Sequence, residues 1–66
     1  MKVRAKLHEG SKTIDIAEKS KVIDVLRELG INPETVLVKR KSEILLEEEP
    51  LKESDEIEVI RIISGG

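Results

Sequence analysis

The sequence predicts an α+β domain in which a single helix packs on one face of a mixed β-sheet. Segments with the two-residue alternation of strands stand on both sides of one segment with helical spacing. The apolar residues are mostly β-branched, nine Ile and six Val beside seven Leu, and such side chains favour sheet over helix. A lone helix between two hairpin-like halves segregates to one face of the sheet, which is typical of α+β proteins.

The first two strands are predicted to form an antiparallel hairpin. Residues 2–8 alternate strictly between polar and apolar side chains, and residues 12–17 do so again after a turn at residues 9–11. One face of such a hairpin is buried and the other is exposed to solvent. The buried side is expected to hold Val3, Ala5, Leu7, Ile14 and Ile16.

The helix is predicted over about nine residues after Ser20, which is placed as its N-cap. Gly30 stands where a left-handed C-cap belongs, and Pro33 prevents the helix from continuing. A helix this short is marginal alone and must pack an apolar stripe on the sheet. Residues at i, i+3, i+4 and i+7 supply that stripe, namely Val22, Val25, Leu26 and Leu29.

Three more strands are predicted after the helix: residues 35–40, a short strand at residues 44–46, and a last strand that begins near Glu56. The polar segment between the last two is a surface loop in which only Leu51 is a candidate core residue. The last strand, which contains IEVIRII, is the most apolar. We therefore expect it in the centre of the sheet, beside the first strand.

The composition excludes several classes of function. The chain has no Cys, and His8 is its only histidine, so disulfides, thiolate sites and an imidazole pair for zinc are absent. There is no aromatic residue to stack on single-stranded nucleic acid, and a net charge of −2 gives no global attraction to phosphate backbones. No apolar run is long enough for a membrane span or a signal peptide, so a cytoplasmic protein is expected.

The chain is also too short for an active site of its own. A domain of 66 residues buries only about 60% of the surface of its unfolded chain, which leaves room for one thin core and no deep pocket. We expect a monomer with no intrinsic catalytic residue and no metal site. Neighbouring acids along a loop or strand do not converge as ligands, so a solvated rim is expected for Glu47, Glu48, Glu49, Glu53, Asp55, Glu56 and Glu58. A charged fraction of 39% with one Asn and no Gln resembles thermophile proteins.

The chain ends on VIRIISGG, and the terminal Gly65 and Gly66 contribute nothing to folding, because Gly loses the most conformational freedom on ordering. With the strand order, the length and the DEIEV segment, this ending resembles the ubiquitin-like β-grasp proteins, above all the ThiS/MoaD sulfur carriers and the small archaeal modifier proteins. The resemblance implies that a partner activating enzyme adenylates the Gly66 carboxylate with ATP and Mg²⁺. No cofactor is expected on the chain itself.

Two fates of the acyl-adenylate follow from the resemblance. A sulfur donor converts it to a thiocarboxylate for a recipient synthase, in thiamin, molybdopterin or tRNA thiolation, or it is joined to a lysine of a target protein as an isopeptide bond. A function of another class stays open, in which the β-grasp domain binds a partner non-covalently and the glycines are incidental.

The residues at the end of the chain are consistent with delivery of an acid to another protein. We expect a folded domain over residues 1–61 and a flexible tail over residues 62–66. Five extended residues reach about 17 Å. Two Gly at the tip let the backbone approach a nucleotide phosphate without a Cβ clash. The Gly66 carboxylate would then attack the α-phosphorus of ATP.

Partner-binding residues are expected on the last strand and its neighbour. Alternation buries Ile57 and Val59 and turns Ile60 outward, where Leu37 of residues 35–40 also points. The corresponding face of ubiquitin-like relatives carries an apolar recognition patch, and the resemblance implies one here. The basic residues Lys2, Arg4, Lys6 and Lys39 are expected around it. The partner-binding set is Leu37, Ile60, Arg61, Ile62 and Ile63.

Ile62 and Ile63 allow two interpretations. A flexible tail is normally polar, and two exposed Ile in water are costly, which favours a role for at least one of them in docking to the partner. The alternative is that Ile62 or Ile63 extends the last strand into the core.

Overall fold

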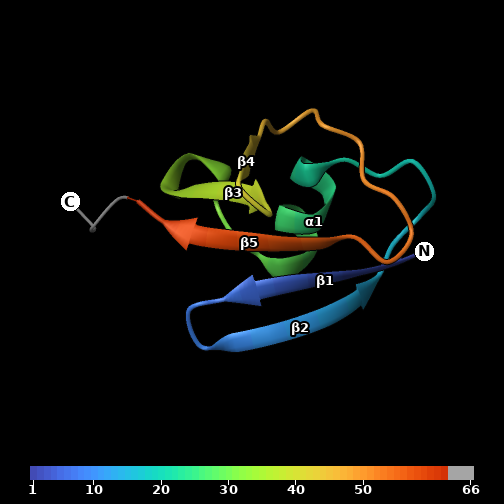
Figure 1. Ribbon diagram of the computed structural model, residues 1–66, viewed down its shortest axis with the longest axis horizontal. Helices are drawn as coiled ribbons and strands as arrows, with labels where there is room; N and C mark the ends of the chain where they lie inside the picture. Colours follow the sequence, from blue (N-terminus) through green and yellow to red (C-terminus); the bar gives the residue numbers. More distant parts are fainter. Residues whose placement is uncertain (63–66) are drawn as a thin grey trace.

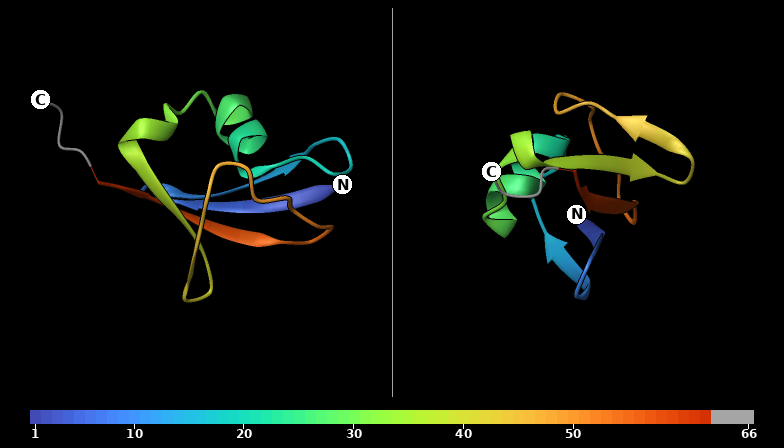
Figure 2. Two further views of the ribbon diagram at one scale, coloured as in Figure 1. Left: turned by 90° about the horizontal axis from the view of Figure 1, so that it is seen from above. Right: turned by 90° about the vertical axis from the view of Figure 1, so that its left-hand side faces the viewer.

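The computed structural model describes residues 1–62, so Ile63, Gly65 and Gly66 lie outside the described residues. The described chain forms a five-stranded mixed sheet with one helix on one face, which confirms the predicted α+β class (Figure 1; Figure 2). The elements in chain order are β1 (Lys2–Leu7), β2 (Gly10–Asp15), α1 (Val22–Leu29), the 3₁₀ helix η1 (Pro33–Thr35), β3 (Val36–Arg40), β4 (Glu43–Leu45) and β5 (Glu56–Arg61).

The sheet has the strand order β2-β1-β5-β3-β4, with β5 in the centre. β1 and β5 run parallel, in a register that begins at Arg4↔Glu56 and ends at Lys6↔Glu58. The other three strand pairs are antiparallel. The predicted position of the last strand, central and beside the first, is therefore confirmed.

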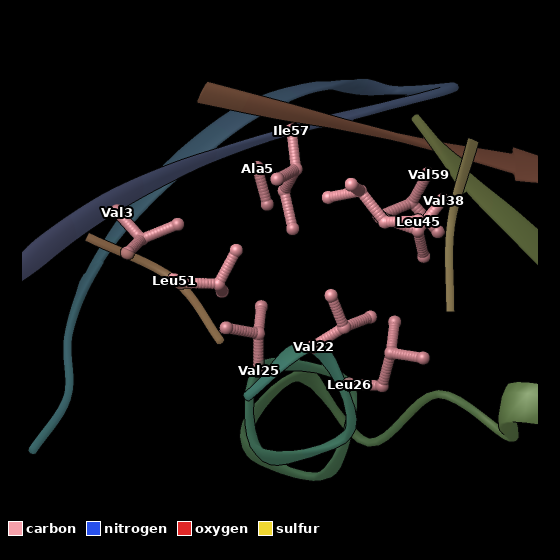
Figure 3. Packing of buried hydrophobic residues seen from close by; sticks show 10 residues of the cluster. All are labelled: Val3, Ala5, Val22, Val25, Leu26, Val38, Leu45, Leu51, Ile57 and Val59. Atoms are coloured by element: carbon pink, nitrogen blue, oxygen red, sulfur yellow. The ribbon is translucent and has the colours of Figure 1, made fainter. Parts of the chain in front are cut away.

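The core lies between α1 and the inner face of the sheet. Figure 3 shows Val22, Val25 and Leu26 of α1 pointing toward Ala5 and Ile57 of the central strands. The predicted helical stripe is confirmed, with Leu29 packed at its partly buried end. The buried apolar residues are Val3, Ala5, Val22, Val25, Leu26, Val38, Leu45, Leu51, Ile57 and Val59.

The start of α1 differs from the prediction, because Lys21 and not Ser20 is the N-cap residue. The Lys21 backbone N–H donates to Asp24 Oδ2 at 2.8 Å, so an acidic side chain in the first turn satisfies the cap. Ser20 is buried and bonded elsewhere: its carbonyl accepts from Leu51 N–H at 2.8 Å and its hydroxyl donates to Ala17 O at 2.7 Å. The C-cap prediction is confirmed, since Gly30 takes φ +72° and ψ +30°.

Several strand boundaries also differ from the prediction by one or two residues. Leu7 pairs with Gly10, so residues 8–9 form the turn and β2 begins two residues earlier than expected. Gly10 permits this because it takes a φ of +137°, which residues with a Cβ rarely adopt. β4 likewise begins one residue early, because Lys41 takes the left-handed φ of +59° and tightens the turn after β3.

The polar segment between β4 and β5 is tied to the domain at several points. Leu51 is buried as predicted, and Lys21 and Pro50 form an isolated β-bridge. An ion pair joins Arg40 Nη1 to Asp55 Oδ2 at 3.0 Å, with side chains only 25% and 17% exposed. α1 has eight residues, and within residues 1–62 no helix is long and apolar enough to cross a membrane.

Candidate functional site at the end of the central strand

The predicted site begins where β5 leaves the sheet. Arg61, the last residue of β5, lies opposite Val36, and Ile62 N–H donates to Thr35 O at 3.0 Å. The register with β3 thus continues one residue past the strand. The tail residues that the prediction assigns to chemistry, Gly65 and Gly66, lie outside the described residues.

A short capping motif fixes the Thr35 carbonyl that receives this bond. Pro33 occupies the first turn of η1, where its missing N–H costs nothing. The Asn32 side chain accepts from Glu34 N–H at 3.0 Å, and Thr35 Oγ1 donates to Asn32 O at 2.8 Å. The segment that leads into β3 therefore holds the end of β5 at a defined place.

The two faces of β5 have different surroundings. Ile57 is 2% exposed, and Val59 is also buried, so both belong to the core as predicted. Ile60 alternates to the outer face and lies directly opposite Leu37 of β3, and both side chains are partly exposed. The predicted adjacency of Leu37 and Ile60 is confirmed. Their role in binding stays a prediction.

The structure adds residues that the sequence reasoning missed. Ile44 of β4 lies opposite Lys39 and is 57% exposed, and Leu46, the next outward position by alternation, is 71% exposed. Ile62, which the predicted partner-binding set already includes, is 53% exposed and is not part of the buried core. We call the group that spans β4, β3 and the end of β5 the outer apolar patch; it consists of Leu37, Ile44, Leu46, Ile60 and Ile62.

The charges beside the outer apolar patch are mixed, which differs from the expected basic surround. Glu58 of β5 lies opposite Lys39 on one side and Lys6 on the other. Arg4 pairs with Glu56 at 3.5 Å. The central strand thus places a carboxylate between the basic side chains of its two neighbours. Opposite charges on adjacent strands stabilise the sheet modestly and cancel its field.

The described residues do not bring metal-binding side chains together. Within residues 1–62 there is no group of three or more His, Cys, Asp or Glu side chains placed to hold a metal ion. His8 is exposed in the turn between β1 and β2. The Asp55 carboxylate already accepts from Arg40 and from Lys52 N–H. The arrangement can present a chain end and a docking surface to another protein.

Comparisons with known proteins agree with this architecture. The sequence profile of the ThiS family matches residues 1–66. The sulfur carrier protein TtuB of Thermus thermophilus is 41% identical over 66 residues, which cover 100% of both chains. An uncharacterized protein of Archaeoglobus fulgidus is 46% identical over 43 residues, or 65% of this chain and 63% of that protein.

A solved structure has the same fold. The crystal structure of SAMP1 from Haloferax volcanii superposes with a TM-score of 0.79 over 100% of both chains, at 21% sequence identity. That likeness confirms the β-grasp fold, and the family match covers the whole chain. The chain therefore belongs to the ThiS family of small ubiquitin-like β-grasp proteins, which are carrier proteins and not enzymes.

Proposed function

We propose that the protein is a sulfur carrier whose Gly66 carboxylate is activated by a partner enzyme. In the first step a carboxylate oxygen attacks the α-phosphorus of ATP, so that an acyl-adenylate forms and pyrophosphate leaves. The enzyme supplies Mg²⁺ and cationic groups that offset the charge of the phosphates. Hydrosulfide, HS−, then attacks the acyl carbon and expels AMP, and loss of a proton leaves a thiocarboxylate at Gly66.

The observation that carries the proposal is the end-to-end match to a sulfur carrier. The alignment with TtuB covers the full length of both chains, so it extends over Gly65 and Gly66 of this chain. The described fold supports the same interpretation, because the strand that leads toward Gly66 is the central one. Because β3 pairs with β5 as far as Ile62, the residues that lead to Gly66 start from a fixed position on the sheet.

The outer apolar patch supports docking of a partner protein next to that position. Its exposed members Ile44, Leu46 and Ile62 are large aliphatic side chains that water solvates poorly. Because charged pairs of opposite sign flank the patch, we propose recognition by apolar burial with little net electrostatic steering. The patch would also be a contact in a purely non-covalent interaction module, so the test must separate docking from activation.

The test is ATP–pyrophosphate exchange with the activating enzyme of the same organism. The parent chain is expected to support exchange, whereas deletion of Gly66 or addition of one residue after it abolishes exchange. Both variants keep the fold, because residues 1–62 contain the whole described domain. Binding of all three chains without any exchange would instead support the non-covalent module. Equal exchange by all three would refute Gly66 as the activated group.

The fate of the activated acid is read by mass spectrometry of protein from its native cells. A sulfur carrier gains the mass of one sulfur in exchange for one oxygen at the C-terminus. Conjugation would instead leave residues 62–66 on acceptor lysines after trypsin, which cuts after Arg61. We propose the thiocarboxylate as the main product, since the full-length relative is a sulfur carrier.

A further inference from the structure

The end of β5 has a neighbouring strand on one side only. β1 accompanies β5 up to Lys6↔Glu58 and then turns away into β2, whereas β3 follows β5 as far as Arg61. Figure 1 shows the arrowhead of β5 running past the end of β1. Along Val59–Arg61, the side of β5 that faces β1 is therefore an unpaired strand edge, although β5 is the central strand of the sheet. We call it the open edge.

Alternation along the strand fixes which main-chain groups face the open edge. Ile62 N–H points to β3, because it donates to Thr35 O. Successive residues of a strand direct their N–H and C=O groups to opposite sides, so those of Arg61 point to the open edge. The Val59 carbonyl, two residues earlier, points the same way. No strand within residues 1–62 pairs with these groups, and such edges readily accept another strand.

The open edge borders a groove that is lined by both apolar and charged residues. Leu7, Ile31 and Val36 line it and are packed against the core cluster, while Ile60 and Ile62 line it from the outer apolar patch. The groove also contains Lys6 and Glu9, which carry opposite charges. An extended segment with apolar side chains on both of its faces fits these apolar residues, because successive side chains of a strand point to opposite faces.

We propose that the open edge accepts an extended segment of the activating enzyme, which takes the place that β1 leaves empty beside Val59–Arg61. The inference rests on the proposed function, and it assigns the main chain of β5 to partner recognition. A strand bound here would continue the contact made by the outer apolar patch, since Ile60 and Ile62 border both surfaces. It would also fix the chain five residues before Gly66, within about 17 Å of the reacting acid.

Two substitutions at Arg61 separate the main chain from the side chain. Arg61→Pro removes the N–H that faces the open edge, whereas Arg61→Ala removes the same side chain and keeps that N–H. The bonds between β5 and β3 come from the alternate residues, including Ile62, so both variants retain them. Thermal unfolding checks that both remain folded at the assay temperature.

The readout is the KM for the carrier in ATP–pyrophosphate exchange. We expect Arg61→Pro to raise the KM about tenfold or more above Arg61→Ala, because one hydrogen bond is lost and the ring obstructs the incoming strand. Equal KM values for the two folded variants would overturn the inference while leaving the proposed function intact. Absence of exchange by the parent chain would refute the proposed function itself.

A second measurement uses the unaltered chain, in case Arg61→Pro does not fold. The Arg61 amide should exchange its hydrogen rapidly in the free protein and at least about tenfold more slowly when the enzyme is bound. Unchanged exchange on binding would overturn the inference. Slow exchange in the free protein, with a dimer in sedimentation, would show that a second copy occupies the edge and would also overturn it.

Discussion

Ile57 and Ile60 offer a matched test of the two faces of β5. Both are isoleucines on the same strand, but Ile57 is 2% exposed in the core and Ile60 is partly exposed beside Leu37. Truncation of Ile57 to Ala removes three buried carbons, about 2.4 kcal/mol of transfer free energy at ~0.8 kcal/mol each. A cavity adds to this, so the free energy of unfolding should fall by about 3–4 kcal/mol. Ile60→Ala leaves no closed cavity and should cost about 1 kcal/mol.

Ile57→Ala should lower the Tm more than Ile60→Ala does, whereas Ile60→Ala should raise the KM more than Ile57→Ala does. About 1 kcal/mol lowers the Tm of a domain this size by roughly 4–8 °C, so Ile57→Ala should lose about 15–25 °C and Ile60→Ala about 5 °C. In pyrophosphate exchange at a temperature where both are folded, Ile60→Ala should raise the KM about tenfold, the effect of a moderate hot spot. Ile57→Ala should raise the KM no more than about twofold, since its side chain does not reach the partner.

The refuting results are specific for each face. Equal losses of Tm would show that Ile60 is packed as tightly as Ile57, which would contradict the assignment of inner and outer faces. A KM increase for Ile57→Ala that matches Ile60→Ala, with both folded, would show that the outer apolar patch is not the recognition surface. If Ile57→Ala does not fold, the matched pair Ile57→Val and Ile60→Val supplies the comparison. Ile57→Val should then cost about 1 kcal/mol, and Ile60→Val should cost less.

Three further predictions concern stability and are read by urea denaturation. Arg40→Ala should cost about 2 kcal/mol, because the largely buried Asp55 carboxylate loses its charged partner and keeps only the bond from Lys52 N–H. Arg4→Ala, whose pair with Glu56 is exposed, should cost under about 0.5 kcal/mol, and equal costs would contradict the difference in burial. Gly30→Ala should cost about 1 kcal/mol, since Gly30 takes a φ of +72° and no atom lies within 4 Å of an added Cβ, and a neutral result would mean that the cap relaxes. Lys41→Gly should have the opposite sign, a gain of about 0.5–1 kcal/mol, because Lys41 is held at φ +59°; a loss would contradict that backbone conformation.

Local patterns in the sequence predicted most of the fold. The alternation of residues 2–8 and the i, i+3, i+4 spacing from Val22 correctly predicted which side chains face the core. Such spacings arise because one face of each strand or helix is buried. Gly30 was identified correctly because its left-handed conformation has a strong residue preference. The error at Ser20 arose because its hydroxyl donates to Ala17 O and its carbonyl accepts from the distant Leu51 N–H, while Asp24 caps the helix at Lys21.

The candidate site was predicted where it follows from the alternation of side chains along β3 and β5. Ile60 and Leu37 were placed on the outer face by alternation, and their pairing follows from the β-grasp strand order. Ile44 and Leu46 were missed, although a two-residue turn after Arg40 would have set their register with β3. The open edge depends on where β1 and β5 part, and no local pattern encodes the length of a parallel pairing between distant segments.

The most direct test of the central claim is to trap the activated acid chemically. The carrier is incubated with the activating enzyme and ATP in the presence of hydroxylamine, which attacks an acyl-adenylate and leaves a hydroxamate on the acyl carbon. We expect a single hydroxamate, located by fragment-ion mass spectrometry on the C-terminal carbonyl of Gly66. A hydroxamate on one of the Asp or Glu side chains, or an unmodified chain after ATP has been consumed, would contradict it.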